Sequence, residues 1–169
     1  ACAFDALRPA IAHVGLLSDR RMSHLWDAFF VRVAGPGTGG PPDGDPPAFK
    51  GLSLRYPAAA RLAELRQLAG PATLDVPVLD MGHEDHATGA PLTVARTAAA
   101  LDVLETLLTA EVLLARDVLA VTRPVPVLGA GSGAMLAAVD ATLAEPAAVA
   151  ATPGAVHDLV REVLRGTAG

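Results

Sequence analysis

Residues 92–121, LTVARTAAALDVLETLLTAEVLLARDVLAV, decide the fold. Apolar side chains recur every three or four residues through this stretch, which is the spacing of an amphipathic helix. We expect one helix from Leu92 to Val121, on the order of 45 Å long. So long a helix needs packing along its whole length, which favours an elongated bundle. The predicted buried stripe comprises Val94, Leu101, Leu104, Leu108, Val112, Ala115 and Leu119.

The composition of the 169-residue chain favours helices throughout. Hydrophobic residues make up 51% of the chain, aromatic residues make up only 4%, and Ala and Leu dominate the apolar set. Such side chains suit helices, whereas β-branched and aromatic side chains suit strands. We therefore predict an all-α protein in which residues 1–169 form a single helical domain.

Charge and cysteine content narrow the classes of function. The net charge of −5 lacks the basic excess of a nucleic-acid binder, so we expect no nucleic-acid partner. The single cysteine, Cys2, permits no intrachain disulfide and fits a reducing, cytoplasmic compartment. No apolar run approaches the roughly 18–20 residues of a membrane span, so we expect no membrane partner.

The same spacing predicts four further helices, and a loop separates the first two. Pro9 falls inside the first pattern, so that helix either starts there or is kinked. Residues 34–50 carry five prolines and five glycines, which predicts a flexible surface loop. Ser132 is expected to cap the helix that begins near it. The four helices are expected at Phe4 to about Val33, Pro57–Ala69, the Gly129–Gly133 turn to about Ala144, and Gly154–Arg165.

One charged stretch, Met81-Gly82-His83-Glu84-Asp85-His86-Ala87-Thr88-Gly89, interrupts the apolar sequence just before the long helix. A rigid helix can position what a preceding loop presents, so a functional site is expected here. The competing interpretation is a polar loop that caps the next helix, and composition leaves both open. A metal site on His83 and His86 is disfavoured, because helical zinc pairs have the spacing of HExxH and need a third ligand.

The order of the segments resembles the aromatic amino-acid lyases, which are the histidine, phenylalanine and tyrosine ammonia-lyases and the related aminomutases. Residues 10–21, AIAHVGLLSDRR, resemble the family's "aiaeiGxLSERR" helix. Residues 58–64 followed by residues 70–73, GPAT, resemble its "AAAL-SE…HPAS" segment. His83-Glu84-Asp85-His86 resembles its "QEDH" signature. The resemblance covers all 169 residues but corresponds only to the C-terminal third or so of a typical member.

This resemblance implies a helical bundle in a tetrameric or larger assembly whose active sites combine several subunits. It also implies an electrophilic methylideneimidazolone, formed from an Ala-Ser-Gly tripeptide, that makes the amine of an aromatic amino acid a leaving group. The chain contains no such tripeptide, and Gly131-Ser132-Gly133 is the nearest string. It also begins in a helical pattern at Ala1 without a methionine, like a chain cut from something longer.

The preferred expectation is therefore the C-terminal subunit or fragment of a carbon–nitrogen lyase. Such a chain is active only with a companion chain, or a missing N-terminal part, that carries the Ala-Ser-Gly segment. The alternative is a non-catalytic helical scaffold or interaction protein derived from this family. The aromatic substrate and the choice between lyase and aminomutase stay open, because the ring-recognition residues of the family lie mostly upstream.

The resemblance also implies roles for the charged stretch. Glu84 matches the signature glutamate and is the candidate catalytic residue, since a carboxylate there holds the substrate ammonium or shuttles its proton if burial raises its pKa. His83 replaces the signature glutamine and is a candidate substrate-binding or site-supporting residue. Asp85 and His86 are expected to fix the loop and cap the following helix.

Overall fold

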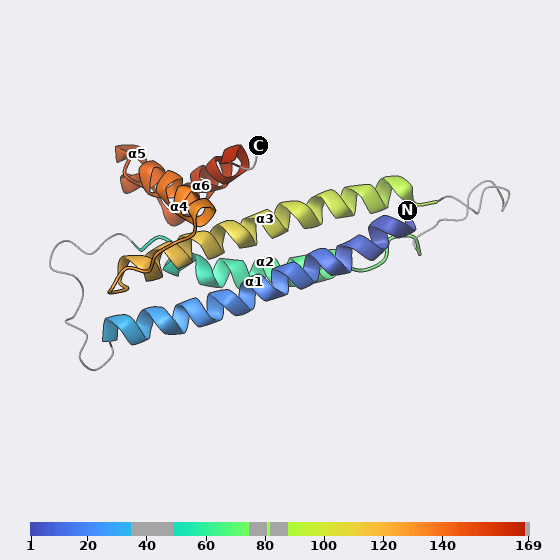
Figure 1. Ribbon diagram of the computed structural model, residues 1–169. Coiled ribbons are helices and arrows are strands. Elements are labelled where there is room, and N and C mark those ends of the chain that lie inside the picture. Colours follow the sequence, from blue (N-terminus) through green and yellow to red (C-terminus); the bar gives the residue numbers. More distant parts are fainter. Residues whose placement is uncertain (35–48, 75–80, 82–87, 168–169) are drawn as a thin grey trace.

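The computed structural model describes residues 1–34, 49–74, 81 and 88–167 (Figure 1). Over these residues every regular element is helical, which confirms the all-α prediction. The five predicted helices occur within a few residues of their expected bounds, whereas the short helices η1 and α5 were not predicted. The elements are α1 (Cys2–Ala34), η1 (Leu52–Leu54), α2 (Arg55–Leu68), α3 (Ala90–Ala120), α4 (Ala130–Leu143), α5 (Pro146–Ala150) and α6 (Pro153–Thr167).

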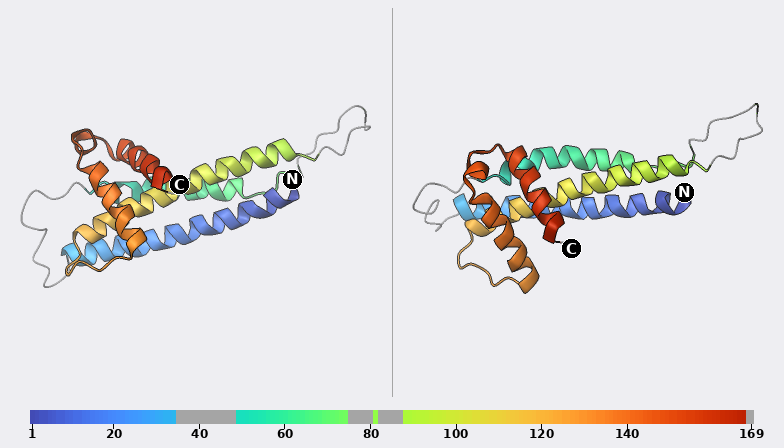
Figure 2. Two further views of the ribbon diagram at one scale, coloured as in Figure 1. Left: turned by 45° about the horizontal axis from the view of Figure 1, so that its top comes forward. Right: turned by 90° about the horizontal axis from the view of Figure 1, so that it is seen from above.

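The helices α1, α2 and α3 lie side by side and form the elongated bundle (Figures 1 and 2). α1 and α3 run in the same direction, and α2 runs in the opposite one (Figure 1). The helices α4, α5 and α6 form a smaller group beside the C-terminal half of α3, which α6 contacts. Among the described helices, none combines the length and the apolar character needed to cross a membrane.

The core lies between the three long helices, where apolar side chains from each are removed from water. Burial of this kind is the main favourable contribution to folding, at roughly 25 cal/mol for each Å² of apolar surface. α1 packs most extensively against α3, so the first and third long helices are the principal partners. The buried side chains include Ile11 and Met22 of α1, Leu62 and Leu65 of α2, and Val103, Leu107, Leu113 and Leu114 of α3.

The buried face of α3 is not the predicted one. Val94 and Leu101 of the predicted stripe are 47% and 45% exposed, and its other five members are only half-buried. Apolar residues occur all round α3, so their period alone cannot choose a face. The observed core face also carries threonines whose hydroxyls bind helix carbonyls. Thr97 donates to Thr93 O at 2.8 Å, and Thr109 donates to Glu105 O at 2.9 Å.

Two expectations about helix ends are corrected. α1 runs from Cys2 through Pro9, so a start at Pro9 is wrong. Ser132 is the third residue of α4 and donates to Gly129 O at 3.1 Å, so it is not the cap. The N-cap of α3 is Gly89, with a φ of 59° that favours glycine.

Residues 35–48, most of the predicted Pro/Gly loop, lie outside the described residues. The last two residues of the predicted range, Phe49 and Lys50, are half-buried rather than solvent-exposed. Lys50 Nζ donates to Ala151 O at 2.7 Å and thereby ties the start of η1 to the end of α5. The C-terminal helices are thus held to the bundle by a hydrogen bond as well as by packing.

Candidate functional site

The predicted site residues His83, Glu84, Asp85 and His86 lie outside the described residues, so their roles stay predictions. The structure does describe where the segment that carries them is attached. The described residues before it end at Leu74, after α2, and those after it begin at Thr88, just before α3. Both attachment points lie at the end of the bundle where α1 begins (Figure 1).

Arg8 of α1 is fully buried at this end of the bundle and binds both attachment points. Its Nε donates to Leu68 O at 2.9 Å, and its Nη2 donates to Gly70 O at 2.7 Å, at the end of α2. Its Nη1 lies 3.3 Å from Thr93 O and 3.4 Å from Thr97 Oγ1, in the first turns of α3. One guanidinium therefore contacts the chain on both sides of the segment that carries Glu84.

Asp5, half-buried one turn before Arg8, completes this polar cluster. Its carboxylate accepts hydrogen bonds from the Thr73 hydroxyl at 2.6 Å, the Thr73 amide at 3.0 Å and the Ala72 amide at 3.1 Å, and it pairs with Arg8. The Thr73 hydroxyl above all, with the two amides and Arg8, stabilises the charged form. These groups outweigh desolvation and hold the pKa of Asp5 well below its usual range.

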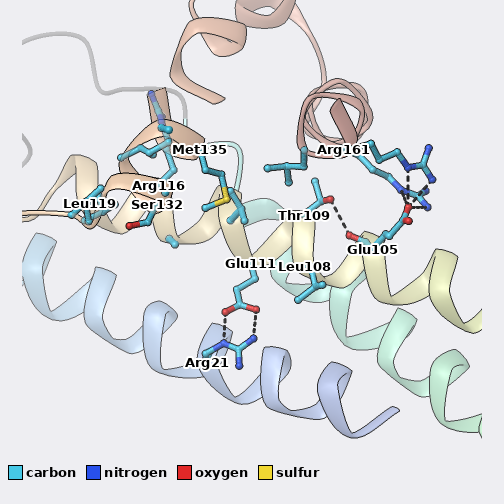
Figure 3. Close-up of a pocket in the computed structure, with 18 residues that line it drawn as sticks. Arg21, Glu105, Leu108, Thr109, Glu111, Arg116, Leu119, Ser132, Met135 and Arg161 are labelled. Atoms are coloured by element: carbon cyan, nitrogen blue, oxygen red, sulfur yellow. Dashed lines mark hydrogen bonds and ion pairs between the residues drawn. The ribbon is translucent and has the colours of Figure 1, made fainter. Parts of the chain in front are cut away.

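A second feature is an open apolar groove of about 1090 Å³ between α3, α4 and α6 (Figure 3). One wall is the half-buried face of α3 that the sequence analysis assigned to the core. The groove therefore explains why that face is apolar without being fully buried in this chain. Its apolar lining includes Leu108, Val112, Ala115, Leu119, Met135 and Leu164.

The charged groups around the groove are paired with one another. Arg21 binds both carboxylate oxygens of Glu111 (Figure 3), and Arg161 and Arg165 share Glu105 at 2.9 and 2.6 Å. Hydrogen bonds from these two arginines hold the pKa of Glu105 below its usual range. Such pairs connect α1 to α3 and α3 to α6, so the groove offers apolar contact rather than acid–base chemistry.

Asp117 is a buried carboxyl at the junction between η1 and α3. It is 1% exposed and accepts a hydrogen bond from the Leu52 amide at 3.0 Å. Burial raises the pKa of Asp117 to about 6, although the Leu52 amide and the Arg116 guanidinium act in the opposite direction. The backbone at Gly51 lies directly on α3, because a Cβ there would come 2.4 Å from Leu114 N. The contacts of Asp117 and Gly51 thus join the start of η1 to α3, and we assign them a structural role.

The sequence contains no Ala-Ser-Gly tripeptide. Gly131-Ser132-Gly133 lies in the exposed first turn of α4, and its serine hydroxyl is bound to Gly129 O. In the part of the chain that the structure describes, no three His, Cys, Asp or Glu side chains are grouped to hold a metal ion. The disfavoured metal pair, His83 and His86, lies outside that part.

Three residues of these clusters were not predicted from the sequence: Asp5, Arg8 and Asp117. The sequence does contain a signal for Asp5 and Arg8. Arg8 lies three residues before Ile11, a core residue, and three residues after the acidic residue Asp5. A charge at a core position with a partner one turn away indicates a buried ion pair. No such signal marks Asp117, whose partner is a backbone amide sixty-five residues away.

The chain is similar to known proteins over most of its length. The family model for aromatic amino acid lyases matches residues 1–141. The solved structure of histidine ammonia-lyase from Trypanosoma cruzi matches with a TM-score of 0.75 and 20% sequence identity. That match covers 98% of this chain and 32% of the enzyme, so the chain spans about a third of its length. No match was found among curated proteins. On the family-model match, the chain belongs to the aromatic amino acid lyase family.

Proposed function

We propose that these residues form the C-terminal part of an ammonia-lyase or aminomutase that acts on an aromatic L-amino acid. The observation that carries the proposal is the family match over residues 1–141, because that range includes His83-Glu84-Asp85-His86. The Ala-Ser-Gly segment comes from polypeptide outside these residues, either a companion chain or an N-terminal part of the same protein. When present, the methylideneimidazolone supplies the electrophile that makes ammonia a leaving group.

Glu84 is the residue of this chain to which we assign chemistry. Its carboxylate holds the ammonium group of the substrate and accepts or returns a proton as the carbon–nitrogen bond breaks. His83 stands where the family has glutamine, so it offers a ring nitrogen in place of an amide for binding the substrate or its surroundings. Asp85 and His86 support the segment.

Exposed apolar side chains support assembly with other polypeptide. Four on α1 recur at helical spacing and are 40–58% exposed, and the groove on α3 adds a second apolar surface. Apolar rows of this extent favour coverage by another chain. We place these surfaces in the contacts of a tetrameric or larger assembly, and we expect the isolated chain to self-associate. The four residues are Phe4, Leu7, Val14 and Leu17.

A non-catalytic scaffold is the second candidate. The replacement of the signature glutamine by His83 favours it, because that change removes an amide from the proposed site. Assembly through α1 and α3 fits a scaffold equally well. The two candidates differ in whether a polypeptide with Ala-Ser-Gly accompanies these residues.

The first experiment is native mass spectrometry with peptide sequencing on the protein purified untagged from its source. A complex or longer chain containing Ala-Ser-Gly supports the lyase proposal, and a protein without it supports the scaffold. Ammonia release from aromatic L-amino acids then measures turnover. Glu84→Gln should slow turnover by about 100-fold or more while assembly is unchanged.

Glu64→Gln is the matched control, since it makes the same change at an exposed glutamate of α2 that pairs with Arg61. It should leave turnover unchanged. Normal turnover in the Glu84→Gln enzyme would remove Glu84 from the mechanism.

A further inference from the structure

We propose that Asp117, Arg116 and Asp140 form a pH-sensitive link, in which the protonation of one buried carboxyl sets how firmly α4 is held to α3. The link lies where the C-terminal helices meet the bundle, and Arg116 also lines the groove between them (Figure 3). It consists of residues that the structure describes, and it is independent of the proposed catalytic activity.

One guanidinium lies between two carboxylates of very different exposure. Arg116 Nε donates to Asp140 Oδ1 of α4 at 3.0 Å, and Arg116 Nη1 lies 3.6 Å from Asp117 Oδ1 of its own helix. The side chain of Asp140 is 50% exposed, whereas that of Asp117 is 1% exposed. The same cation therefore attaches α4 to α3 and balances a charge inside the bundle.

The attachment of α4 depends on few groups. Asp140 is the only charged residue in the sequence of this helix, so any ionic contact of α4 has to use its carboxylate. Of the fourteen residues of α4, all of which the structure describes, only Val139 is buried. The helix packs mainly against α6 rather than along α3. The pair with Arg116 is therefore the direct ionic contact between α4 and α3.

Asp117 is the member of this link that changes charge near neutral pH. Burial raises its pKa to about 6, against the opposing effects of the Leu52 amide and Arg116. From η1 Asp117 faces backbone amides, and from α3 it faces Arg116, so this guanidinium is the charged group that responds to its ionisation. Lys50, two residues before Leu52, is directed to α5 instead, where its Nζ donates to Ala151 O at 2.7 Å.

Coulomb's law gives the direction of the effect. Below about pH 6 Asp117 is neutral, so the full positive charge of Arg116 attracts Asp140. Above that pH the carboxylate of Asp117 offsets this positive charge and also repels the carboxylate of Asp140. Water and salt screen a buried charge less than an exposed one, so the effect reaches across the interface. We therefore expect α4 to be held more firmly below pH 6 than above it.

Hydrogen exchange of the α4 amides in the complete protein tests the link, once the rates are corrected for the intrinsic dependence of exchange on pH. In the wild type the protection of these amides should fall about 2- to 5-fold from pH 5 to pH 7, as expected when one exposed ion pair is weakened. Asp117→Asn removes the ionisation, so protection should be the same at both pH values. Wild-type protection that is constant or rises with pH would overturn the proposal.

Asp140→Asn separates the link from a general loss of stability. In this variant Asp117 still changes charge, but α4 has no carboxylate to respond to it. Protection of α4 should therefore be low at pH 5 and should fall no further at pH 7, and a continued fall would overturn the proposal. Glu162→Gln is the matched control, because it removes an exposed carboxylate of α6 that pairs with Arg165. It should keep the wild-type dependence on pH.

The variants also distinguish this link from the histidine of α6, since a histidine ordinarily changes charge in the same pH range. His157 Nε2 lies 3.0 Å from Thr106 O of α3, and His157 Nδ1 lies 3.2 Å from Asp158 Oδ1, so this ring joins α6 to α3. His157 is present in every variant above. If it controlled α4 through α6, protection in Asp117→Asn would fall with pH as much as in the wild type, and that result would overturn the proposal.

Discussion

Replacing Asp117 by asparagine tests the buried carboxyl at the η1–α3 junction, and its effect can be worked out from the pKa. Burial raises that pKa from 3.8 to about 6. Between these values the native protein binds more protons than the unfolded chain, so the free energy of unfolding falls as the pH rises. At about 1.4 kcal/mol per pKa unit, ionised Asp117 lowers stability by on the order of 3 kcal/mol above pH 6.

The Asp117→Asn variant keeps an oxygen that can accept the Leu52 amide but cannot ionise. Its unfolding free energy, relative to that of the wild type, should therefore rise by on the order of 3 kcal/mol between pH 4 and pH 7. Urea unfolding followed by circular dichroism measures this at fixed ionic strength and fixed protein concentration, since association adds to apparent stability.

The difference between the unfolding free energies of the two proteins does not contain the contributions of groups that titrate in both. Asp27→Asn, at an exposed position of α1, controls for the substitution itself. A difference between Asp117→Asn and the wild type that stays constant from pH 4 to pH 7 would refute the reasoning. It would mean that the carboxyl loses its proton without a cost from burial.

Three further outcomes are expected in the same unfolding assay. Leu107→Ala should cost about 2–5 kcal/mol because the side chain is fully buried, whereas Leu101→Ala, at a 45% exposed position, should cost less than about 1 kcal/mol; equal losses would contradict the observed face of α3. Gly51→Ala should cost about 1–3 kcal/mol because its Cβ would meet the backbone of α3, and Gly131→Ala, with no atom within 4 Å, is the control. Asp5→Asn should destabilise the protein at pH 7, and the difference should shrink as the pH falls below 3.8, because the unfolded wild-type chain then binds a proton at Asp5 while the native carboxylate, with its lowered pKa, stays charged; a difference independent of pH would contradict the hydrogen bonds assigned to it.

Helix positions could be predicted because they depend on local spacing. Proline and glycine interrupt the apolar periods between helices, and the predicted bounds differ from the observed ones by a few residues. The short helices η1 and α5 escaped prediction because one turn of helix leaves too few residues to show a period. One of the two alternatives predicted at Pro9, a helix that starts there, is wrong. α1 continues through Pro9 with the support of packing against α3.

The choice of core face on α3 needed tertiary information. Leu101 and Leu108 are more hydrophobic than Thr93 and Thr97, yet the threonines are buried. Their hydroxyls are satisfied within the helix or by Arg8, which a hydrophobicity pattern does not register. The charged stretch could be located from the sequence through the family resemblance, and the family is confirmed. The contacts of Arg8 could not be predicted, because they join groups sixty or more residues apart.

The pairing of α1 with α3 also shapes how the protein is made. α1 is complete at Ala34, but its principal partner is complete only at Ala120. A ribosome that adds about 5–20 residues per second leaves α1 without that partner for roughly 4–17 s. During this interval α2 is completed first and can pack against α1, whereas the contacts of α1 with α3 have to wait. The order of the helices therefore leaves the side of α1 that faces α3 unpartnered for longer during translation than the side that faces α2, which is complete at Leu68.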